Sequence, residues 1–412
     1  MRTDLAPEFA ATAEGRRAEA ILRKCVHRGF CTATCPTYQL LGDELDGPRG
    51  RIYLIKQVLE GKPATEKTRL HLDRCLTCRS CETTCPSGVE YVQLLDIGRR
   101  VVEDGLPRRG PERVVRAVLR ETLPRPWLFG PAVRLGQLVR PLLPGAIADK
   151  LPPEAAGVVR PWPQSKAHPR RMLTLAGCVQ PSLAPNINAA AARILDRLGI
   201  ALFEADGAGC CGALRFHLND QEAGRADMRR NIDAWWPHVE AGVEAILVTA
   251  SGCAVQVRDY GHVLADDPVY AEKAARIASL CRDPSEVLAG LRLQLAPLME
   301  AARGDRGRVA FHSPCSLQHG LGVRGTIEEL LVSCGYTLVP VADSHLCCGS
   351  AGTYSILQPE ISKRLRDNKL NALNTGSPQF IATANIGCLS HLQAGSDLPV
   401  RHWVELVDEV LA

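Results

Sequence analysis

The chain has 412 residues, of which 46% are hydrophobic and 23% charged, and its formal net charge is +4. This length is typical of two or three domains, and the hydrophobic fraction is high enough to build buried cores, which excludes a wholly disordered chain. Aromatic residues make up only 5% and the net charge is small, so the composition predicts neither a base-stacking platform nor a basic nucleic-acid surface.

The seventeen cysteines are the most informative feature of the composition. The N-terminal residues lack the apolar core of a signal peptide, and no apolar run is long enough for a transmembrane helix. We therefore expect a cytoplasmic protein, with peripheral association with the inner membrane as an alternative. Disulfides rarely persist in the cytoplasm, and an odd number of cysteines cannot all pair within one chain. The cysteines are predicted to be metal ligands.

Residues 1–110 are predicted to form an all-helical ferredoxin-type domain with two iron–sulfur motifs. Residues 14–25 and 50–61 have the apolar spacing of helices. The strand pairs of a compact ferredoxin are absent from the sequence between the two motifs, which favours a helical scaffold.

The second motif in this region is the bacterial ferredoxin run C-x2-C-x2-C-x3-C-P, formed by Cys75, Cys78, Cys81, Cys85 and Pro86. In such a run the first three thiolates bind one cluster, and the fourth cysteine turns away to bind the other. A zinc site, the alternative, would more often place pairs of ligands on two separate knuckles. The spacing therefore predicts an iron–sulfur cluster.

The first motif has the same frame, with Cys25, Cys31, Cys35 and Pro36, but Arg28 stands where the second cysteine is expected. Swapped ligation assigns Cys35 to a complete [4Fe–4S] cluster with Cys75, Cys78 and Cys81. Cys25, Cys31 and Cys85 are left as three ligands of a second cluster. Arginine cannot replace a thiolate, because it stays protonated and only donates. A three-iron centre, a four-iron centre with an external ligand and an empty site remain open, as does ligation by His27.

The C-terminal part of the chain contains an internal duplication. Cys178 precedes the pair Cys210-Cys211 by the same distance that separates Cys315 from the pair Cys347-Cys348, and a glycine follows each pair. Cys253 and Cys388 end two further similar segments, and Arg229 and Asn231 align with Arg366 and Asn368. Each copy therefore carries four cysteines in the arrangement C…CCG…GC.

The segments around these cysteines alternate between strand and helix patterns. Short apolar runs at 171–178, 201–205 and 245–250 recur at 308–315, 337–341 and 380–385, with helical stretches between them. This alternation predicts one parallel sheet per copy, and ligands collect at the carboxyl ends of such strands. The predicted fold is therefore multidomain α and α/β, with a first CCG domain at 166–300 and a second at 301–412.

The eight recurring cysteines are predicted to bind metal, in two sets. The first set is Cys178, Cys210, Cys211 and Cys253, and the second is Cys315, Cys347, Cys348 and Cys388. Four thiolates suit a further iron–sulfur cluster or zinc, while the adjacent pair also suits an unusual open cluster or a redox-active dithiol. Cys281 and Cys334 have no counterpart in the repeat and are predicted to be small core residues.

A basic, proline-rich connection is predicted at 111–165. Residues 99–150 carry eleven Arg or Lys and five Asp or Glu, interleaved with apolar groups. The seven prolines of this stretch predict short and broken helices. The connection is either a solvated linker folded on its neighbours or a docking segment for an acidic partner or an anionic membrane surface.

These motifs resemble a known group of proteins, in which a helical ferredoxin domain precedes two CCG domains. The group includes heterodisulfide reductase subunits, lactate-utilisation proteins and the iron–sulfur subunit of anaerobic glycerol-3-phosphate dehydrogenase. Within it, this chain is most similar to the iron–sulfur subunits of bacterial glycolate oxidase (glycolate dehydrogenase). Four segments, at 30–61, 71–91, 346–355 and 383–411, carry the resemblance. Arg28 departs from the family pattern, where a cysteine is expected.

The resemblance implies an electron-transfer subunit without FAD of its own. Partner flavin (FAD) subunits would oxidise glycolate to glyoxylate, and this chain would pass the electrons to a quinone or another acceptor. The sequence agrees on one point, because no G-x-G-x-x-G follows a predicted strand. Two alternatives remain, a CCG subunit that acts directly on a disulfide or another acceptor, and a scaffold held together by zinc. The sequence identifies no catalytic residue.

Overall fold

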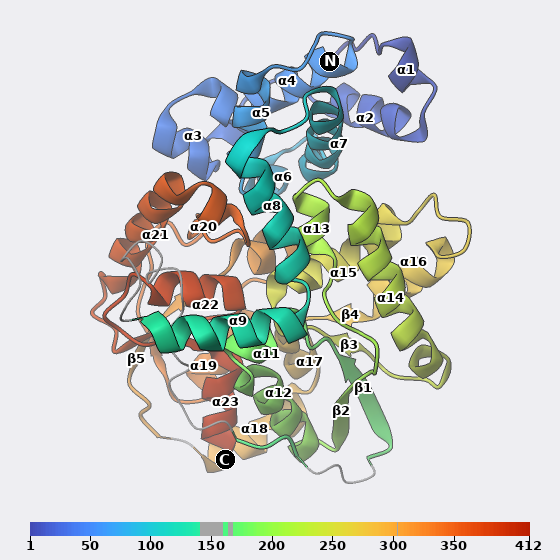
Figure 1. Cartoon of the computed structure of the whole chain (residues 1–412). Helices are drawn as coiled ribbons and strands as arrows, with labels where there is room; N and C mark the ends of the chain where they lie inside the picture. Colours follow the sequence, from blue (N-terminus) through green and yellow to red (C-terminus); the bar gives the residue numbers. More distant parts are fainter. Residues whose placement is uncertain (141–159, 164–167, 303) are drawn as a thin grey trace. The chain divides into compact units, whose positions relative to one another are not determined.

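The structure is a computed structural model that describes residues 1–140, 160–163, 168–302 and 304–412. The chain divides into two compact units, and Figure 1 labels their elements. Unit 1 contains residues 1–117 and 345–369, and unit 2 contains residues 118–344 and 370–412. Two helices cross from one unit to the other, α8 (Gly110–Thr122) and α21 (Pro359–Asn374).

Unit 1 is helical throughout its described residues. Its N-terminal elements are α1 (Pro7–Ala10), α2 (Ala13–Lys24), η1 (Phe30–Thr32), α3 (Pro36–Leu41), η2 (Glu44–Asp46), α4 (Pro48–Leu59), α5 (Glu66–Asp73), α6 (Ser80–Thr84) and α7 (Tyr91–Gly105). A short helix from the second CCG segment, α20 (Tyr354–Leu357), also belongs to this unit. The predicted all-helical ferredoxin region is confirmed.

Helices α4 and α7 form the centre of the unit 1 core. Ile55, Leu94 and Leu95 are fully buried there. The helices approach closely at Gly98, where a Cβ atom would lie only 2.5 Å from Ile55 Cγ1. The cysteine-bearing segments follow α2 and α5, and both of these helices pack against α4 and α7.

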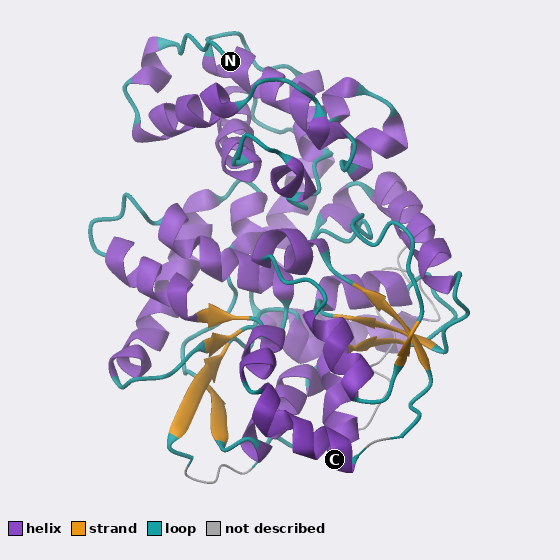
Figure 2. Ribbon diagram, turned by 180° about the vertical axis from the view of Figure 1, so that it is seen from behind, coloured by secondary structure: helices purple, strands orange, loops and turns teal. Residues whose placement is uncertain are grey.

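Unit 2 contains two four-stranded sheets, in which every strand pair is parallel. The first has the order β2-β1-β3-β4 and the second β6-β5-β7-β8. Figure 2 shows them as two separate groups of orange arrows. The strands are β1 (Arg170–Thr174), β2 (Ile200–Glu204), β3 (Ile246–Leu247), β4 (Cys281–Arg282), β5 (Arg308–His312), β6 (Thr337–Leu338), β7 (Phe380–Thr383) and β8 (Val400–His402). Both predicted parallel sheets are confirmed.

Helices connect the strands of both sheets. In the first repeat these are α11 (Gln180–Leu183), α12 (Asn186–Arg197), α13 (Ala213–His217), α14 (Gln221–Glu240), α15 (Ser251–Val263), α16 (Ala271–Leu280), α17 (Pro284–Gly290) and α18 (Arg292–Ala301). In the second they are η4 (Ser316–Leu321), α19 (Thr326–Ser333), α22 (Ile386–Gln393) and α23 (Trp403–Leu411), besides α20 and α21. The order of elements makes each copy a βαβ-type unit.

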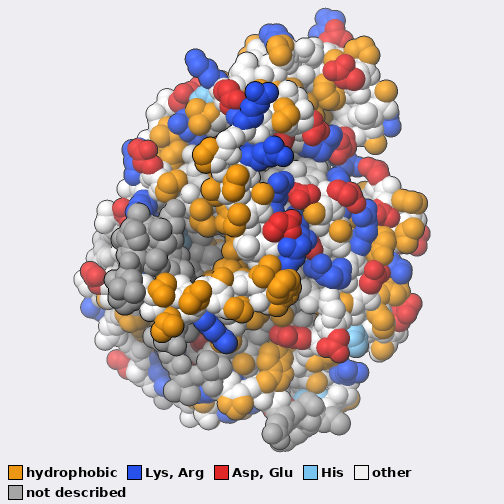
Figure 3. All heavy atoms as spheres, viewed as in Figure 1, with side chains coloured by type: hydrophobic (Ala, Val, Ile, Leu, Met, Phe, Trp, Pro, Cys, Tyr) orange, Lys and Arg blue, Asp and Glu red, His pale blue; other side chains and the backbone are white. Residues whose placement is uncertain are grey.

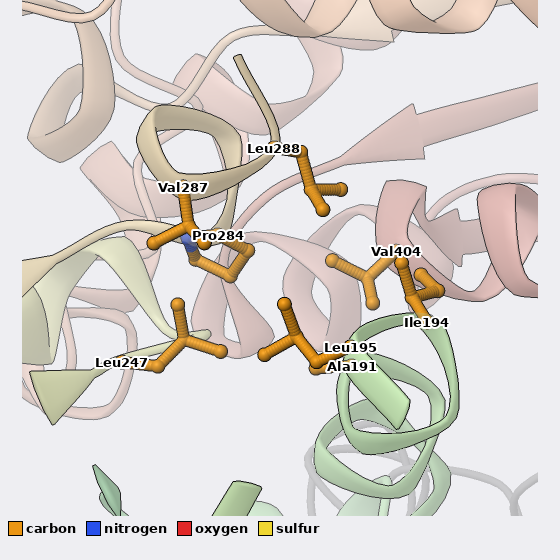
Figure 4. Close-up of a pocket in the computed structure, with 8 residues that line it drawn as sticks. All are labelled: Ala191, Ile194, Leu195, Leu247, Pro284, Val287, Leu288 and Val404. Atoms are coloured by element: carbon orange, nitrogen blue, oxygen red, sulfur yellow. The ribbon is translucent and has the colours of Figure 1, made fainter. Parts of the chain in front are cut away.

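The two repeats share one hydrophobic core within unit 2. The last helix, α23, packs on α12 of the first repeat, and Arg193 binds the buried Asp408 carboxylate at 2.7 Å. Figure 4 shows a small cavity between these elements and α17, lined entirely by apolar side chains such as Leu195, Leu288 and Val404. Without a polar group to orient a ligand, this cavity is a packing feature of the core.

The sequence patterns did not predict the fourth strand of either sheet. β4 and β8 each contain an arginine and lie outside any longer apolar run, and each leads directly into a helix whose N-cap is Asp283 or His402. Cys281 lies in β4, and Cys334 directly follows α19. Both cysteines are fully buried, as expected of core residues.

The helices of the basic connection are longer than predicted. α8 has 13 residues, and α9 (Pro126–Val139) has 14. Pro111 and Pro126 occupy helix starts, where no intrahelical N–H bond is lost, and only Pro131 lies inside α9. Residues 141–159 and 164–167 of the predicted connection, and hence its boundary at 165, lie outside the described residues.

Helix α9 exposes several large apolar side chains. Trp127, Leu135 and Leu138 are between 63% and 78% exposed, and Figure 3 shows apolar side chains gathered over this helix. In the described ranges, no helix has both the length and the apolar composition to cross a membrane.

Candidate metal centres

Four of the predicted ligands line one cavity in unit 1. Cys35, Cys75, Cys78 and Cys81 all open into a space of about 320 Å³, which includes open solvent at its mouth. Cys35 comes from the start of α3, Cys75 and Cys78 come from the loop between α5 and α6, and Cys81 lies in α6. The structure thus brings together the four cysteines that swapped ligation assigns to one complete cluster.

The loop from Cys75 to Cys81 has the backbone of a ligand cradle. Thr77 and Arg79 both adopt left-handed conformations, with φ of 52° and 61°. This arrangement turns peptide N–H groups toward the thiols, and the Thr77 amide donates to Cys75 Sγ at 3.5 Å. The hydroxyl of Tyr91 also donates to Cys75 Sγ, at 3.7 Å.

A buried charge network lies behind this cavity. Arg51 lines the cavity and is only 1% exposed, and its guanidinium donates to His71 O at 2.6 Å and to Thr37 Oγ1 at 3.1 Å. Asp46, also fully buried, accepts from Arg74 at 2.8 Å and lies 3.6 Å from Arg51. Burial lowers the pKa of Arg51, but neighbouring groups, with Cys75 first, raise it above its ordinary value. A permanent positive charge therefore faces the cysteines.

The remaining three N-terminal cysteines form a second group. Cys25 is buried, while Cys31 and Cys85 are half-buried. Burial, and then the neighbouring thiols of Cys25 and Cys85, raises the pKa of Cys31 to about 11. Arg28 is exposed, so no buried side chain replaces the missing thiolate at position 28. The ring of His27, the other candidate ligand, contacts Met1 Sδ through Nε2 at 3.1 Å.

Crowded thiols of this kind suit a cationic cluster. Burial, followed by Cys78 and Cys75, raises the pKa of Cys81 well above its ordinary value. Thiolates packed this closely repel one another without a cation, and a bound metal removes that cost by holding them deprotonated. The donor set and the N–H groups aimed at sulfur therefore fit an iron–sulfur group at both N-terminal positions, one with four thiolates and one with three.

The first CCG set converges at one edge of the first sheet. Cys178 follows β1, Cys210 and Cys211 follow β2, and Cys253 lies in the first turn of α15 after β3. These thiols form a hydrogen-bonded series, in which Cys178 and Cys211 donate to Cys210, and this lowers the pKa of Cys210 well below its ordinary value. A hydrogen bond between Cys211 and Cys253 extends the series to the fourth member.

Two buried side chains hold the first CCG loop in place. The Asn231 carboxamide accepts from Gly209 N at 2.8 Å and donates to Cys210 O at 2.8 Å, and the Tyr260 hydroxyl donates to Cys211 O at 2.9 Å. The alignment of Asn231 with Asn368 marked it in the sequence as a residue that recurs in both copies. Tyr260 has no aligned tyrosine in the second copy. The sequence therefore gave no signal for Tyr260.

The second CCG set is divided between the compact units. Cys315 is the N-cap of η4 and Cys388 lies in the first turn of α22, both in unit 2. In unit 1, Cys347 Sγ accepts from Gly349 N at 3.4 Å, and Gly349 has the same φ of 87° as Gly212 in the first copy. The two CCG turns thus share one backbone conformation, which glycine adopts without strain.

Known protein families match the same three regions of the chain. The family described as a 4Fe-4S dicluster domain matches residues 21–89, and the family described as a cysteine-rich domain matches twice, at 172–258 and 309–393. The glycolate oxidase iron–sulfur subunit of Escherichia coli (strain K12) is 55% identical over 412 residues, which cover 100% of this chain and 99% of that protein. The chain belongs to the family of glycolate oxidase iron–sulfur subunits.

Two further relatives share less identity with this chain. The probable glycolate oxidase iron–sulfur subunit of Bacillus subtilis (strain 168) is 32% identical over 407 residues, covering 92% of this chain and 90% of that protein. Lactate utilization protein A of Exiguobacterium sp. is 24% identical over 238 residues, covering 56% of this chain and 94% of that protein. The predicted resemblance to glycolate oxidase iron–sulfur subunits is therefore confirmed, and so is the duplicated cysteine-rich region.

Proposed function

We propose that this chain is the electron-transfer subunit of a flavin-dependent glycolate oxidase, in which partner subunits oxidise glycolate to glyoxylate. The observation that carries the proposal is the grouping of its N-terminal cysteines, four around one cavity and three beside it. Membership of the glycolate oxidase iron–sulfur subunit family supports the choice of substrate and of flavin-binding partners. A quinone or another acceptor takes the electrons in the end.

Each set of N-terminal cysteines has a defined part in this proposal. Cys35, Cys75, Cys78 and Cys81 hold a complete [4Fe–4S] cluster, and Cys25, Cys31 and Cys85 hold a second one. Such clusters accept and release one electron at a time. They would therefore carry the two electrons of a reduced flavin one after the other to the acceptor. Arg51 offsets the negative charge gained on reduction, and the N–H group of Thr77 and the hydroxyl of Tyr91 orient Cys75.

The CCG cysteines are proposed to hold a further iron–sulfur cluster or zinc in each copy. A second candidate function, direct reduction of a disulfide or another acceptor at a CCG site, draws on the hydrogen-bonded thiol series from Cys178 to Cys253. In that series, hydrogen bonds from Cys178 and Cys211 lower the pKa of Cys210, which favours the thiolate form that attacks a disulfide.

Metal analysis and EPR of the anaerobically purified complex test the main proposal. We expect iron and acid-labile sulfide for at least two clusters per chain, and the appearance of the EPR signal of reduced [4Fe–4S]⁺ clusters when glycolate is added together with the flavin subunits. Zinc in stoichiometric amount without iron would instead establish the scaffold alternative.

Substitution of the CCG cysteines separates the candidates for that region. Cys211→Ser and Cys348→Ser are matched, because each removes the second cysteine of its pair. Loss of turnover in an assembled complex indicates electron transfer or catalysis, whereas loss of assembly itself indicates a structural metal. Cys281→Ser, at a buried cysteine outside the sets, reports the cost of a core substitution alone.

Peripheral membrane contact is proposed for the basic connection. Helix α9 combines the exposed Trp127, Leu135 and Leu138 with one basic residue, Arg134, and an arginine caps each of its ends, which suits an interfacial helix. Sedimentation with anionic vesicles tests this proposal. We expect the native complex to sediment with the vesicles, and a double variant with Trp127→Ser and Leu138→Ser to remain in the supernatant. Equal sedimentation of the variant would contradict it.

A further inference from the structure

The loop around Arg28 has kept the backbone of a cluster-binding loop. His27 and Gly29 are left-handed, with φ of 56° and 81°, and so are Thr77 and Arg79 fifty residues later, with φ of 52° and 61°. Arg28 therefore occupies the same position between two left-handed residues that Cys78 occupies in the complete loop. The left-handed conformation costs a non-glycine residue such as His27 about 1 kcal/mol or more of conformational free energy. Contacts with the rest of the protein must therefore hold the loop in this shape.

This loop faces solvent. Val26 and Phe30 on either side of Arg28 are 57% and 54% exposed, and Arg28 is itself exposed. Cys31 and Cys85 are half-buried, so two of the three thiols in this group are partly exposed, whereas only Cys78 is half-buried among the four of the complete set. The exposed loop and these partly exposed thiols place the group within reach of a small molecule from solution.

Two arginines lie on or against the loop at position 28. Arg49 lies against the loop, because its Nη1 is 3.5 Å from His27 O and a Cβ atom on Gly29 would lie 2.9 Å from that nitrogen. Glu44 binds Arg49 through Nε at 2.6 Å, which fixes the guanidinium and partly balances its charge. Arg28 adds a second guanidinium on the loop itself, so the local field favours an anion.

We propose that Cys25, Cys31 and Cys85 hold a four-iron cluster whose fourth iron, at the position of residue 28, binds an exchangeable small anion, with Arg28 and Arg49 attracting that anion. This inference rests on the proposed function, since it requires clusters at these cysteines. The ligand class is that of small anionic donors such as hydroxide, carboxylates and cyanide. Binding is a simple exchange, in which the anion displaces water or hydroxide from iron and no electron is transferred.

An iron bound by no protein thiolate should also leave more easily than its neighbours. Oxidation by ferricyanide takes one electron from the [4Fe–4S]²⁺ cluster, releases Fe²⁺ and leaves a [3Fe–4S]⁺ cluster on Cys25, Cys31 and Cys85. Added Fe²⁺ and a thiol reductant, which returns the electron, restore the four-iron form. The complete cluster, with one thiolate for each iron, keeps all its iron under the same mild treatment.

The test uses the full-length chain, purified anaerobically and treated first with ferricyanide and then with isotopically labelled Fe²⁺ and a thiol. We expect a three-iron EPR signal after oxidation, followed by uptake of about one labelled iron per chain. Cyanide is the probe ligand, and it should change the Mössbauer spectrum of the labelled iron alone. Cys31→Ser, which removes a ligand of this cluster only, gives the iron background of all other sites.

Two substitutions at position 28 make the test specific. Arg28→Cys supplies the missing thiolate, so ferricyanide should release no iron and cyanide should leave the spectrum unchanged. Arg28→Ala should retain the exchangeable iron but bind cyanide about 3- to 10-fold more weakly, as expected for the loss of one screened charge. The spectra report these effects without any measurement of turnover.

The outcomes separate this inference from the proposed function. A chain with one complete cluster and no iron at Cys25, Cys31 and Cys85, or with a three-iron centre that takes up no further iron, overturns the inference and leaves electron transfer by the complete cluster intact. If Arg28→Ala binds cyanide as strongly as the native chain, the Arg28 charge does not attract the anion, and this result also overturns the proposal. A chain without iron or sulfide overturns the proposed function itself.

Discussion

The hydroxyl groups of Thr34 and Thr84 lie 3.2 Å apart, and these two residues are separated by the same fifty positions as Cys25 and Cys75. Each threonine directly precedes the last cysteine of its motif, Cys35 or Cys85. Both hydroxyls also donate to Ser80 O, at 3.4 and 2.9 Å. The two motifs are thus related copies that meet at these threonines, which is why the last cysteine of each copy can reach the other group.

Substitution of Cys78 by arginine should convert the complete set into a second three-thiolate set. Because residue 78 has the same loop position as residue 28, we expect Cys78→Arg to fold and to show an additional ferricyanide-labile iron. Iron analysis and EPR of the purified chain measure this effect. Cys78→Ala is the control that removes the thiolate without adding a charge, and an unchanged iron content in both variants would refute the ligand assignment.

The cysteine sets could be predicted from the sequence, because the frame of each motif fixes which thiols share a loop. The same holds for β1, β2 and β3 and their counterparts in the second sheet, whose apolar runs and intervening helices leave a clear pattern. β4 and β8 leave none, since, unlike the equally short β3 and β6 within the runs 245–250 and 337–341, each contains an arginine and lies outside any longer apolar run. Their presence depends on pairing with a neighbouring strand.

The surroundings of the cysteines were much less predictable. Arg51 comes from α4 and Tyr91 from α7, and only tertiary packing brings them to Cys75. An arginine in an amphipathic helix is ordinarily expected at the surface, yet Arg51 is buried with Asp46 as its counter-ion. Long-range partners of this kind have no local sequence signature.

Removal of the Arg51 charge should lower the reduction potential of the complete cluster. Reduction adds negative charge next to this buried guanidinium, so Arg51→Gln should shift the potential downward by roughly tens of millivolts. An EPR-monitored redox titration measures the shift. Arg51→Lys keeps the charge and should retain most of the potential, so an equal shift in both variants would indicate a packing effect instead.

Gly98 is required for the close approach of α7 to α4. In Gly98→Ala the new methyl group would meet Ile55 Cγ1 at 2.5 Å, and such overpacking typically costs about 1–3 kcal/mol. Gly105, in the same helix, has nothing within 4 Å, so Gly105→Ala should change stability by less than about 1 kcal/mol. Denaturant titration of both variants checks the difference, and equal stabilities would contradict the packing described for this core.

Asn231 should be the most sensitive support of the first CCG loop. Asn231→Ala leaves buried groups of Gly209, Cys210 and Tyr260 without this partner, which should cost about 2–4 kcal/mol and weaken metal retention by the first set. Thermal denaturation and metal analysis measure both effects. Tyr260→Phe removes a single hydroxyl and should cost about 1 kcal/mol, so a larger loss in that variant would assign the main support to Tyr260.

His402 joins the two repeats and should make unit 2 sensitive to acid. Its Nδ1 accepts from Val404 N at 3.3 Å, and Nε2 lies 3.2 Å from Thr249 O, to which it donates. Burial lowers the pKa of His402 from 6.5 to about 4. The neutral ring thus stabilises the fold fully above pH 6.5, and this contribution, at most about 3 kcal/mol, is lost as the pH falls from 6.5 toward 4.

His402→Asn tests this linkage, because its carboxamide oxygen can still accept from Val404 N. The variant should be less stable than the native chain at pH 7.5, since Thr249 O loses its donor, by about 1 kcal/mol. Between pH 7 and 5.5, however, its melting temperature should fall less steeply than that of the native chain, because no buried imidazole takes up a proton on unfolding. Parallel slopes for the two proteins would mean that other groups cause the acid sensitivity, while a steeper slope for the variant would reverse the assigned direction.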